Sequence, residues 1–349
     1  MCYVLPSAAS MSKMRILRAM SPNHTHRFQV LSALEAIGRT PLIELAHIPK
    51  GCGRILAKLE FLNPGGSKKD RIGQQMIQDA QDAGLLHPGQ PVVELTSGNT
   101  GAGLAIVCTI TGHPFVAVMS KGNSEERAIM MQALGAEVVL VDQHPTSPRG
   151  HVTGADLDLV EHEAQRLVEE RGAFRADQFE LASNWRAHYL GTGSEIWSAT
   201  EGLDAFCDFV GTGGSFAGCS KYFKEQDPSV ACYVVEPESC AVLSGRPVQD
   251  PRHRIQGGGY SKPHLKMLDL AGVTPDGYIS VSDHEAIEYA RRLGREEGLC
   301  AGISSGANLA AAMKLLTGPH KGQTIAILLN DSGLKYLSTD LFSHLRRRE

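Results

Sequence analysis

Short apolar runs alternate along the chain with longer stretches in which apolar residues recur at helical spacing. From residue 92 onward, Gly or Pro separates most of these segments, as expected between strands and helices. The runs are a few residues long and apolar nearly throughout, which is typical of parallel strands covered on both faces. The predicted strands are 92–95, 115–119, 138–141, 206–210, 232–236 and 324–329.

The stretches between these runs predict helices. In the first of them, Ile72, Met76, Ile77 and Ala80 fall on one helical face. The predicted helices span 71–83, 100–111, 124–134, 157–171, 184–198, 215–224, 283–297 and 307–316. This alternation indicates an α/β fold with open, mostly parallel, twisted sheets covered by helices.

The amino-acid composition indicates which kind of ligand or partner the protein binds. The 349 residues suggest about two domains, and 34 Lys+Arg against 38 Asp+Glu give a net charge of −4 without any long basic run. We therefore expect no nucleic-acid partner. Apolar stretches such as 104–110 are far shorter than the roughly 20 residues of a membrane-spanning helix, so we expect no membrane partner either and infer a small-molecule ligand.

The spacing of the cysteines and the composition of the N-terminus indicate in which cellular compartment the protein is expected. None of the eight cysteines forms a pair at the two-residue spacing of zinc or redox motifs, so we expect reduced thiols, no metal site and a cytoplasmic protein. The first 34 residues contain no Asp or Glu. Residues 1–28 are predicted to be a flexible tail; the alternative is a transit peptide, which would place the protein in a mitochondrial or plastid matrix.

Four glycine-rich turns stand where a strand or loop leads into a helix, the position at which open α/β folds bind ligands. They are 63–71, which contains Lys69, then 96–101, 211–215 and 302–306. Backbone amides at the start of a helix can hold a carboxylate or a phosphate. We therefore expect anion binding at these turns.

Three familiar motifs fit these turns poorly. The turn 63–71 lacks the spacing of a phosphate-binding Walker loop, and the turn 211–215 lacks the third glycine of a dinucleotide site, since Phe216 stands there. The turn 302–306 matches a Gly-x-Ser-x-Gly nucleophile elbow, with Asp331 and His344 following. A serine hydrolase is not favoured, because little chain follows Ser304 and no oxyanion segment is evident.

Taken together, the four motifs resemble the pyridoxal-phosphate β-replacing family of cysteine synthase and cystathionine β-synthase. They are Ser67-x-Lys69-x-Arg71, Thr96-Ser97-Gly98-Asn99-Thr100-Gly101, Gly211-Thr212-Gly213-Gly214-Ser215 and Gly302-Ile303-Ser304-Ser305-Gly306, and they lie in the family's order and spacing. The resemblance runs from 37–42 to 336–339, about nine tenths of the chain. It implies a two-lobed fold of type II, similar to tryptophan synthase β. The larger, cofactor-binding lobe would be 29–68 plus 177–345, and the smaller, mobile lobe 69–176.

The resemblance also implies the role of each site residue. Lys69 would be catalytic, first forming the Schiff base with pyridoxal 5'-phosphate and then moving the substrate's Cα proton. The cofactor phosphate would lie on the turn of Gly211, Thr212, Gly213, Gly214 and Ser215, with Asn99 at the ring 3-hydroxyl and Ser304 at the ring nitrogen. The substrate would be bound by Thr96, Ser97, Gly98, Thr100, Gln178, Gly257 and Tyr260.

The reaction so implied converts O-acetylserine and sulfide into cysteine and acetate through an aminoacrylate, as in cysteine biosynthesis. A homodimer and a bound serine acetyltransferase tail would be the family's partners. Alternatives remain for the second substrate, because Tyr260 stands where cystathionine β-synthases carry a tyrosine: an O-phosphoserine donor, or homocysteine or an amine as nucleophile. A catalytically silent paralogue that acts as a binding module is the alternative of another class.

Lys68 departs from the family, which usually has a small apolar residue there. We expect either an outward, solvated lysine or an anion contact for a phosphorylated or carboxylate-bearing substrate.

Overall fold

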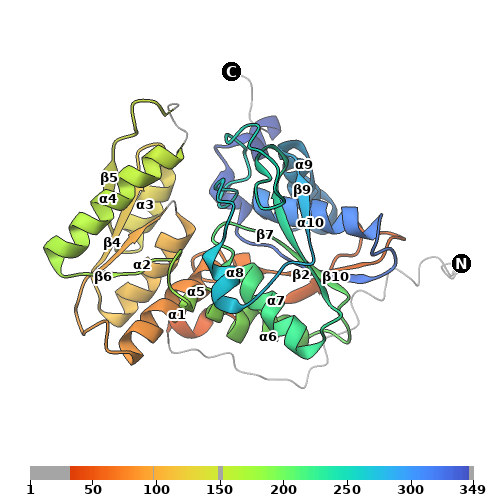
Figure 1. Cartoon of the computed structure of the whole chain (residues 1–349), viewed down its shortest axis with the longest axis horizontal. Helices are drawn as coiled ribbons and strands as arrows, with labels where there is room; N and C mark the ends of the chain where they lie inside the picture. The colour runs from red at the N-terminus through yellow and green to blue at the C-terminus, as the bar shows by residue number, and fades with distance from the viewer. Residues whose placement is uncertain (1–31, 97, 148–151, 346–349) are drawn as a thin grey trace, which may run out of the picture. The chain divides into compact units, whose positions relative to one another are not determined.

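Two β-sheets organise the residues that the computed structural model describes, which are 32–96, 98–147 and 152–345 (Figure 1). The predicted tail 1–28 lies outside them. The larger sheet has the order β1-β2-β10-β7-β8-β9 and is parallel except for the edge pair β1–β2. Its strands are β1 Leu42–Glu44, β2 Arg54–Lys58, β7 Ala205–Phe209, β8 Ala231–Pro237, β9 Gly277–Val281 and β10 Thr324–Leu328.

The smaller sheet is parallel throughout and has the order β5-β4-β3-β6. Its strands are β3 Val92–Leu95, β4 Phe115–Ser120, β5 Glu137–Val141 and β6 Phe174–Arg175. Along β4, alternate side chains serve two cores: Ala117 and Met119 pack toward helices on one face, whereas Val116 and Val118 pack toward α4 on the other. This double burial explains why the strand is apolar at nearly every position.

Helices cover both faces of each sheet. Those that accompany the smaller sheet are α1 Lys69–Asp82, α2 Asn99–Thr111, α3 Glu125–Ala133 and α4 Gly154–Arg171. Those that accompany the larger sheet are α5 Ser183–Ala187, α6 Ser194–Ser198, α7 Gly214–Gln226, α8 Lys266–Ala271, α9 Asp283–Glu297 and α10 Ile303–Leu316. Short 3₁₀ turns add Ala33–Ala36, Glu60–Leu62, Glu238–Cys240, Gly333–Tyr336 and Asp340–Leu345. No described helix is long and apolar enough to cross a membrane.

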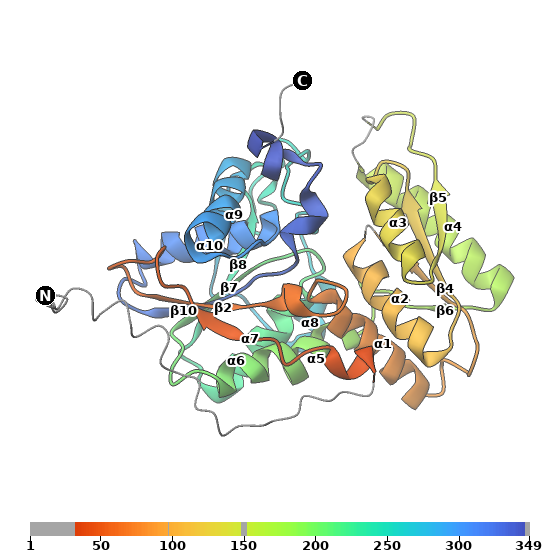
Figure 2. The same ribbon diagram turned by 180° about the vertical axis from the view of Figure 1, so that it is seen from behind.

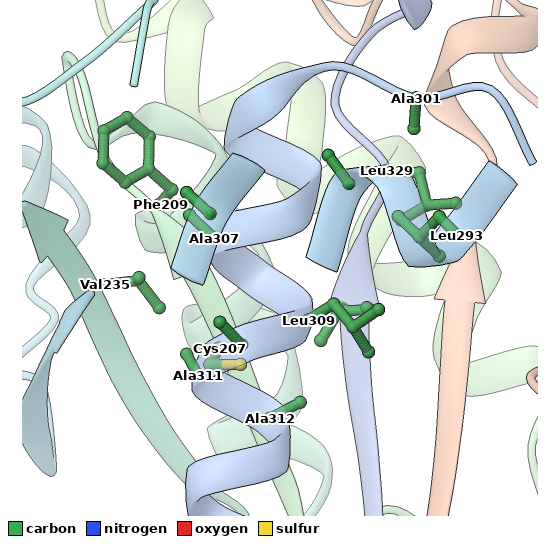
Figure 3. Packing of buried hydrophobic residues seen from close by; sticks show 14 of the residues in the cluster. Cys207, Phe209, Val235, Leu293, Ala301, Ala307, Leu309, Ala311, Ala312 and Leu329 are labelled. Atoms are coloured by element: carbon green, nitrogen blue, oxygen red, sulfur yellow. The ribbon is translucent and has the colours of Figure 1, made fainter. Parts of the chain in front are cut away.

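The core of the larger sheet follows the same alternation. On β7, Cys207 and Phe209 face α9 and α10, while Phe206 packs in the core shared with α7. Figure 2 shows α9 and α10 above the strands and α6 and α7 below them. In the close view, Ala307 and Ala311 of α10 lie beside Phe209 and Cys207, so small residues let the helix approach the strand (Figure 3).

All six predicted strands are present, with ends shifted by at most one residue, but β1, β2, β6 and β9 were missed. In β2 the reason is a charge. It ends on Lys58, which is 2% exposed and pairs with Glu195 at 2.7 Å. The predicted helix 184–198 is interrupted, because a π-helical stretch, His188–Gly193, separates α5 from α6. The lobe boundaries stay a prediction.

Candidate functional site

A cavity of about 430 Å³ lies where the four glycine-rich turns meet. Three of those turns follow the carboxyl ends of parallel strands or open the helix beyond them: Thr96 follows β3, Gly211 follows β7, and Ser304 stands in the first turn of α10. The cavity's volume is in the range of small-molecule sites. Its position at the strand ends is where the turns were expected to bind a ligand.

The cavity brings together nearly all of the site residues predicted from the sequence. The lining includes Lys69, Thr96, Gly98, Asn99, Thr100, Gln178, Gly211, Thr212, Gly213, Ser215, Gly257, Tyr260 and Ser304. Gly214 is not part of the lining; a Cβ at that residue would lie 1.9 Å from Asn184 Oδ1, so its smallness serves packing. Ser97 lies outside the described residues. The role of each residue toward a ligand stays a prediction.

Lys69 is the first residue of α1 and projects its amine into the cavity. Its Nζ donates to Gln178 Oε1 at 3.2 Å, and the same oxygen accepts from Thr100 Oγ1 at 2.8 Å. Burial, followed by the neighbouring charge of Lys68, lowers the pKa of Lys69 to about 7. A large fraction of this amine is therefore neutral near pH 7, and the neutral form is the nucleophile.

Lys68 is buried, at 9% exposure, and lines the same cavity. Its Nζ lies 3.0 and 3.2 Å from the two carboxylate oxygens of Asp208 and 2.7 Å from Ser215 Oγ. The expectation of an outward, solvated lysine is therefore wrong. The physical reason is Asp208, which is fully buried on β7 and needs a cation. Its distance of 140 positions from Lys68 left no local signal in the sequence.

Ser304 presents a hydroxyl at the cavity wall. Asn330 Nδ2 donates to Ser304 Oγ at 3.1 Å, so the serine's own proton is available for an acceptor in the cavity. Asn330 Oδ1 is buried and has no partner among the described residues. His344 is exposed and is not part of the lining. The hydrolase arrangement of Ser304 with Asp331 and His344 is therefore not formed.

A polar cluster at the start of α2 was missed from the sequence. Asn99 Nδ2 donates to Asp331 Oδ2 at 2.7 Å, and Lys335 Nζ donates to Asn99 Oδ1 at 2.7 Å. Tyr336 also donates its hydroxyl to Asp331 Oδ2, at 2.6 Å. These contacts fix the orientation of the Asn99 amide and leave one of its N–H groups for a ligand. The pairs are more than 200 positions apart, and no spacing rule connects them.

Cations outnumber acids in the cavity wall. Lys68, Lys69, Arg127 and Lys335 line it, against Glu126 and Asp331. Arg127, on α3, donates to Gln256 Oε1 in the loop that also carries Tyr260, so this contact joins segments that flank the two sheets. Tyr260 meets Phe179 edge to face, with ring centroids 6.1 Å apart. The arrangement suits a ligand with more than one anionic group.

Comparisons with known proteins found similar sequences and similar structures. A family model described as "Pyridoxal-phosphate dependent enzyme" matches residues 33–331. A cysteine synthase of Staphylococcus aureus is 39% identical over 88% of this chain and 96% of its own length. The crystal structure of O-acetyl serine sulfhydrylase isoform 3 from Entamoeba histolytica covers 95% of this chain and 96% of its own, with a TM-score of 0.82 and 33% identity. That of O-acetylserine dependent cystathionine beta-synthase from Helicobacter pylori covers 90% and 99%, with a TM-score of 0.79 and 31% identity.

Proposed function

Because the chain belongs to the family of pyridoxal-phosphate-dependent enzymes, we propose that it replaces the β-substituent of an activated serine. O-acetylserine and sulfide are the proposed substrates, and cysteine and acetate are the products. The relative named cysteine synthase and the structure named O-acetyl serine sulfhydrylase support this choice. The single observation that supports it most strongly is the amine of Lys69, with its pKa near 7, which lies in one cavity with the Ser304 hydroxyl and the glycine-rich turn 211–215.

The residues of the cavity fit the cofactor. The turn 211–215 opens α7, whose first amides have no acceptor within the helix, and Gly213 has a φ of +86°, which favours glycine. This turn would hold the phosphate, Ser304 would face the ring nitrogen and Asn99 the 3-hydroxyl. When bound, the cofactor supplies an aldehyde that captures an amine and a ring that draws electrons from the substrate's Cα.

The substrate carboxylate fits the start of α2. Thr96 Oγ1 accepts from the amides of Gly98 and Gly101 at 3.2 and 2.9 Å, which leaves the threonine proton free to donate to a carboxylate. Gln178 uses its oxygen toward Lys69 and Thr100, so its amide N–H groups are the donors it can offer a ligand. These donors would orient the amino acid with its Cα near Lys69.

The chain's own groups then favour loss of a β-substituent. The neutral form of Lys69 Nζ, which is a large fraction of this amine near pH 7, can accept the proton from the substrate's Cα. Ser304 is a hydroxyl and not a carboxylate, so beside the ring nitrogen it would not hold that nitrogen protonated, and a bound ring would be a modest electron sink. That balance favours expulsion of acetate over transamination. Sulfide adds at Cβ, and the proton from Cα is returned, which gives one cysteine and one acetate for each O-acetylserine.

The test is a matrix of donors and nucleophiles. Purified protein with pyridoxal phosphate receives O-acetylserine, O-phosphoserine or serine, each with sulfide or homocysteine, and the amino-acid product is identified by mass spectrometry. We expect cysteine from O-acetylserine and sulfide, loss of activity in Lys69→Ala, and full activity in Lys121→Ala, whose side chain is 52% exposed and pairs with Asp142. Folded, cofactor-loaded protein that turns over no donor would contradict the proposal and favour the silent binding module.

A second candidate uses more highly charged substrates. The cations Arg127 and Lys335 in the wall favour an O-phosphoserine donor, or a nucleophile that carries its own carboxylate such as homocysteine. The structure named O-acetylserine dependent cystathionine beta-synthase supports the second of these. If an anionic donor is used, Arg127→Leu will raise KM for O-phosphoserine more than KM for O-acetylserine. Equal effects on both donors would argue against this candidate.

Partners and location are further parts of the proposal. We propose that the protein is a homodimer and is located in the cytoplasm. We also propose that the cavity accepts the C-terminal tail of a serine acetyltransferase. The support is the family alone. Light scattering after gel filtration tests the dimer, and a tail peptide that competes with O-acetylserine for the cavity would support the third point. Monomeric protein, or a peptide that does not compete, would contradict the respective point.

A further inference from the structure

Two buried charges that the proposed reaction does not use lie beneath the turn 211–215. Asp208, at the end of β7, is fully buried and accepts from Lys68, from Ser215 Oγ and from Asn308 Nδ2 at 3.0 Å. Asn308 in turn donates its second N–H to the backbone oxygen of Leu328 at 2.9 Å. The carboxylate is therefore held from three sides. A buried ion pair contributes little net stability compared with apolar residues of similar size, so the pair calls for another role.

The position of the Lys68 ammonium supplies that role. An ammonium has three protons, and Nζ is oriented here by Asp208 on one side and by Ser215 Oγ, 2.7 Å away, on the other. Ser215 is the last residue of the anion-binding turn, and both side chains line the cavity. Because the Ser215 hydroxyl donates its proton to Asp208 and accepts from Lys68 Nζ, the donors that this end of the cavity can offer a phosphate are Nζ and the backbone amides at the start of α7.

We propose that Lys68 binds the cofactor phosphate as a second lysine of the site, with Asp208 holding its amine in place beside the turn 211–215. This inference rests on the proposed function, which places the phosphate on that turn. A charge-assisted hydrogen bond to phosphate is among the strong ones. The helix start of α7 and the Lys68 ammonium then bind the same dianion from two directions.

The two adjacent lysines thus have different roles, Lys68 toward the phosphate and Lys69 toward the aldehyde. The Lys68 amine is engaged by the Asp208 carboxylate and by Ser215 Oγ, so it is held away from an aldehyde at Lys69. Lys69 has no carboxylate at hydrogen-bond distance among the described contacts; its Nζ meets the neutral Gln178. Adjacent positions at the start of α1 point one amine to the phosphate end of the cavity and the other to its reactive end.

The experiment compares two cofactors that differ only in the phosphate. Apo protein, prepared by removing the cofactor from the full chain, is titrated with pyridoxal phosphate and with pyridoxal by equilibrium dialysis. Lys68→Met is the test variant, and the exposed Lys121→Met is its matched control. We expect Lys68→Met to weaken pyridoxal phosphate binding about tenfold or more, as loss of a charge-assisted hydrogen bond implies. Any change in the reactivity of Lys69 alters the binding of both ligands alike, so the measure is the ratio of the two affinities, which should fall about tenfold or more in the variant. Inorganic phosphate should also compete less well in the variant's pyridoxal phosphate site than in wild type.

A second variant guards against a folding defect. Lys68→Met leaves Asp208 buried without its cation, so Lys68→Met/Asp208→Leu removes both charges together. The double variant should show the same selective loss of pyridoxal phosphate affinity. Equal losses for both ligands would overturn the proposal and make Lys68 a structural counterion, and unchanged affinities would overturn it as well. Wild-type protein that is folded but binds neither ligand would instead refute the proposed function itself.

Discussion

The proposed reaction depends on the lowered pKa of the Lys69 amine, and this pKa can be measured for that one side chain. Burial and the adjacent charge of Lys68 lower its pKa from 10.5 to about 7. At pH 7 about half of the Lys69 amines are then neutral, against about one in three thousand for a lysine at the ordinary pKa. The predicted gain in nucleophile is about a thousandfold, in a side chain that still reaches the cavity.

The perturbation is Lys68→Met, which removes the neighbouring positive charge while Asp208, whose charge raises the pKa of Lys69, remains. Both effects act in the same direction, so the pKa of Lys69 will rise. The assay is pulsed acetylation of the apo protein across a pH series, with the Lys69 peptide quantified by mass spectrometry. Wild type should show a midpoint about pH 7, and the variant a higher one. The exposed Lys121 serves as an internal reference for an ordinary lysine.

Two results would refute this reasoning. A wild-type midpoint for Lys69 near that of Lys121 would show that burial does not depress its pKa. A midpoint that does not move upward in Lys68→Met would show that the neighbouring charge is not felt at Lys69.

Three further predictions concern stability. Gly306→Ala will destabilise the protein by about 1–3 kcal/mol, because the added Cβ would lie 2.0 Å from a backbone oxygen of α9. Gly294→Ala will be neutral or stabilising by up to about 1 kcal/mol, because the nearest atom to its Cβ would be 4.0 Å away. Thermal denaturation of the two variants tests this difference. Arg71→Met removes the cation that pairs with the buried Glu60 and one of the two cations that pair with Glu195, and it will cost about 3–5 kcal/mol in urea unfolding. The exposed Arg166→Met will change stability little, and equal losses would refute this. Burial raises the pKa of Glu195 but the hydrogen bonds and charge of Arg71 outweigh it and lower the value from 4.5 to about 2; the stability it contributes is present above pH 4.5 and lost as pH falls toward 2, and acid unfolding that is unaffected by Glu195→Gln would contradict it.

Sequence predicted the parts of the fold whose signals are local. The strand β3 and the helix α9 have the predicted bounds. In the structure β3 is buried at every position, and the side chains of Ser282 and Glu285 cap the start of α9. The strand β2 was missed because Lys58 breaks its apolar run, and the partner that neutralises it, Glu195, is distant in the chain. The comparisons confirm the predicted family and the two-lobed α/β fold.

The residues of the candidate site also fall into those that local sequence signals predicted and those that they did not. Lys69, Ser304 and most of the turn 211–215 line the cavity, and they could be predicted because each lies in a contiguous motif that opens a helix. The contacts that position these residues were missed. Lys68 contacts Asp208 and Asn99 contacts Asp331 only because the folded chain brings them together. Pairs so far apart require tertiary structure, and no periodicity or motif spacing in a single sequence connects them.

The measurement that tests the central claim most directly is the identity of the lysine that bonds to the cofactor. The loaded protein is reduced with borohydride, digested, and its labelled peptide is sequenced by tandem mass spectrometry, which separates Lys68 from Lys69. The account predicts the pyridoxyl label on Lys69 alone, since Asp208 and Ser215 engage the Lys68 amine whereas the Lys69 amine contacts only the neutral Gln178 among the described hydrogen bonds. A label on Lys68, or on no lysine of this peptide, would contradict the account.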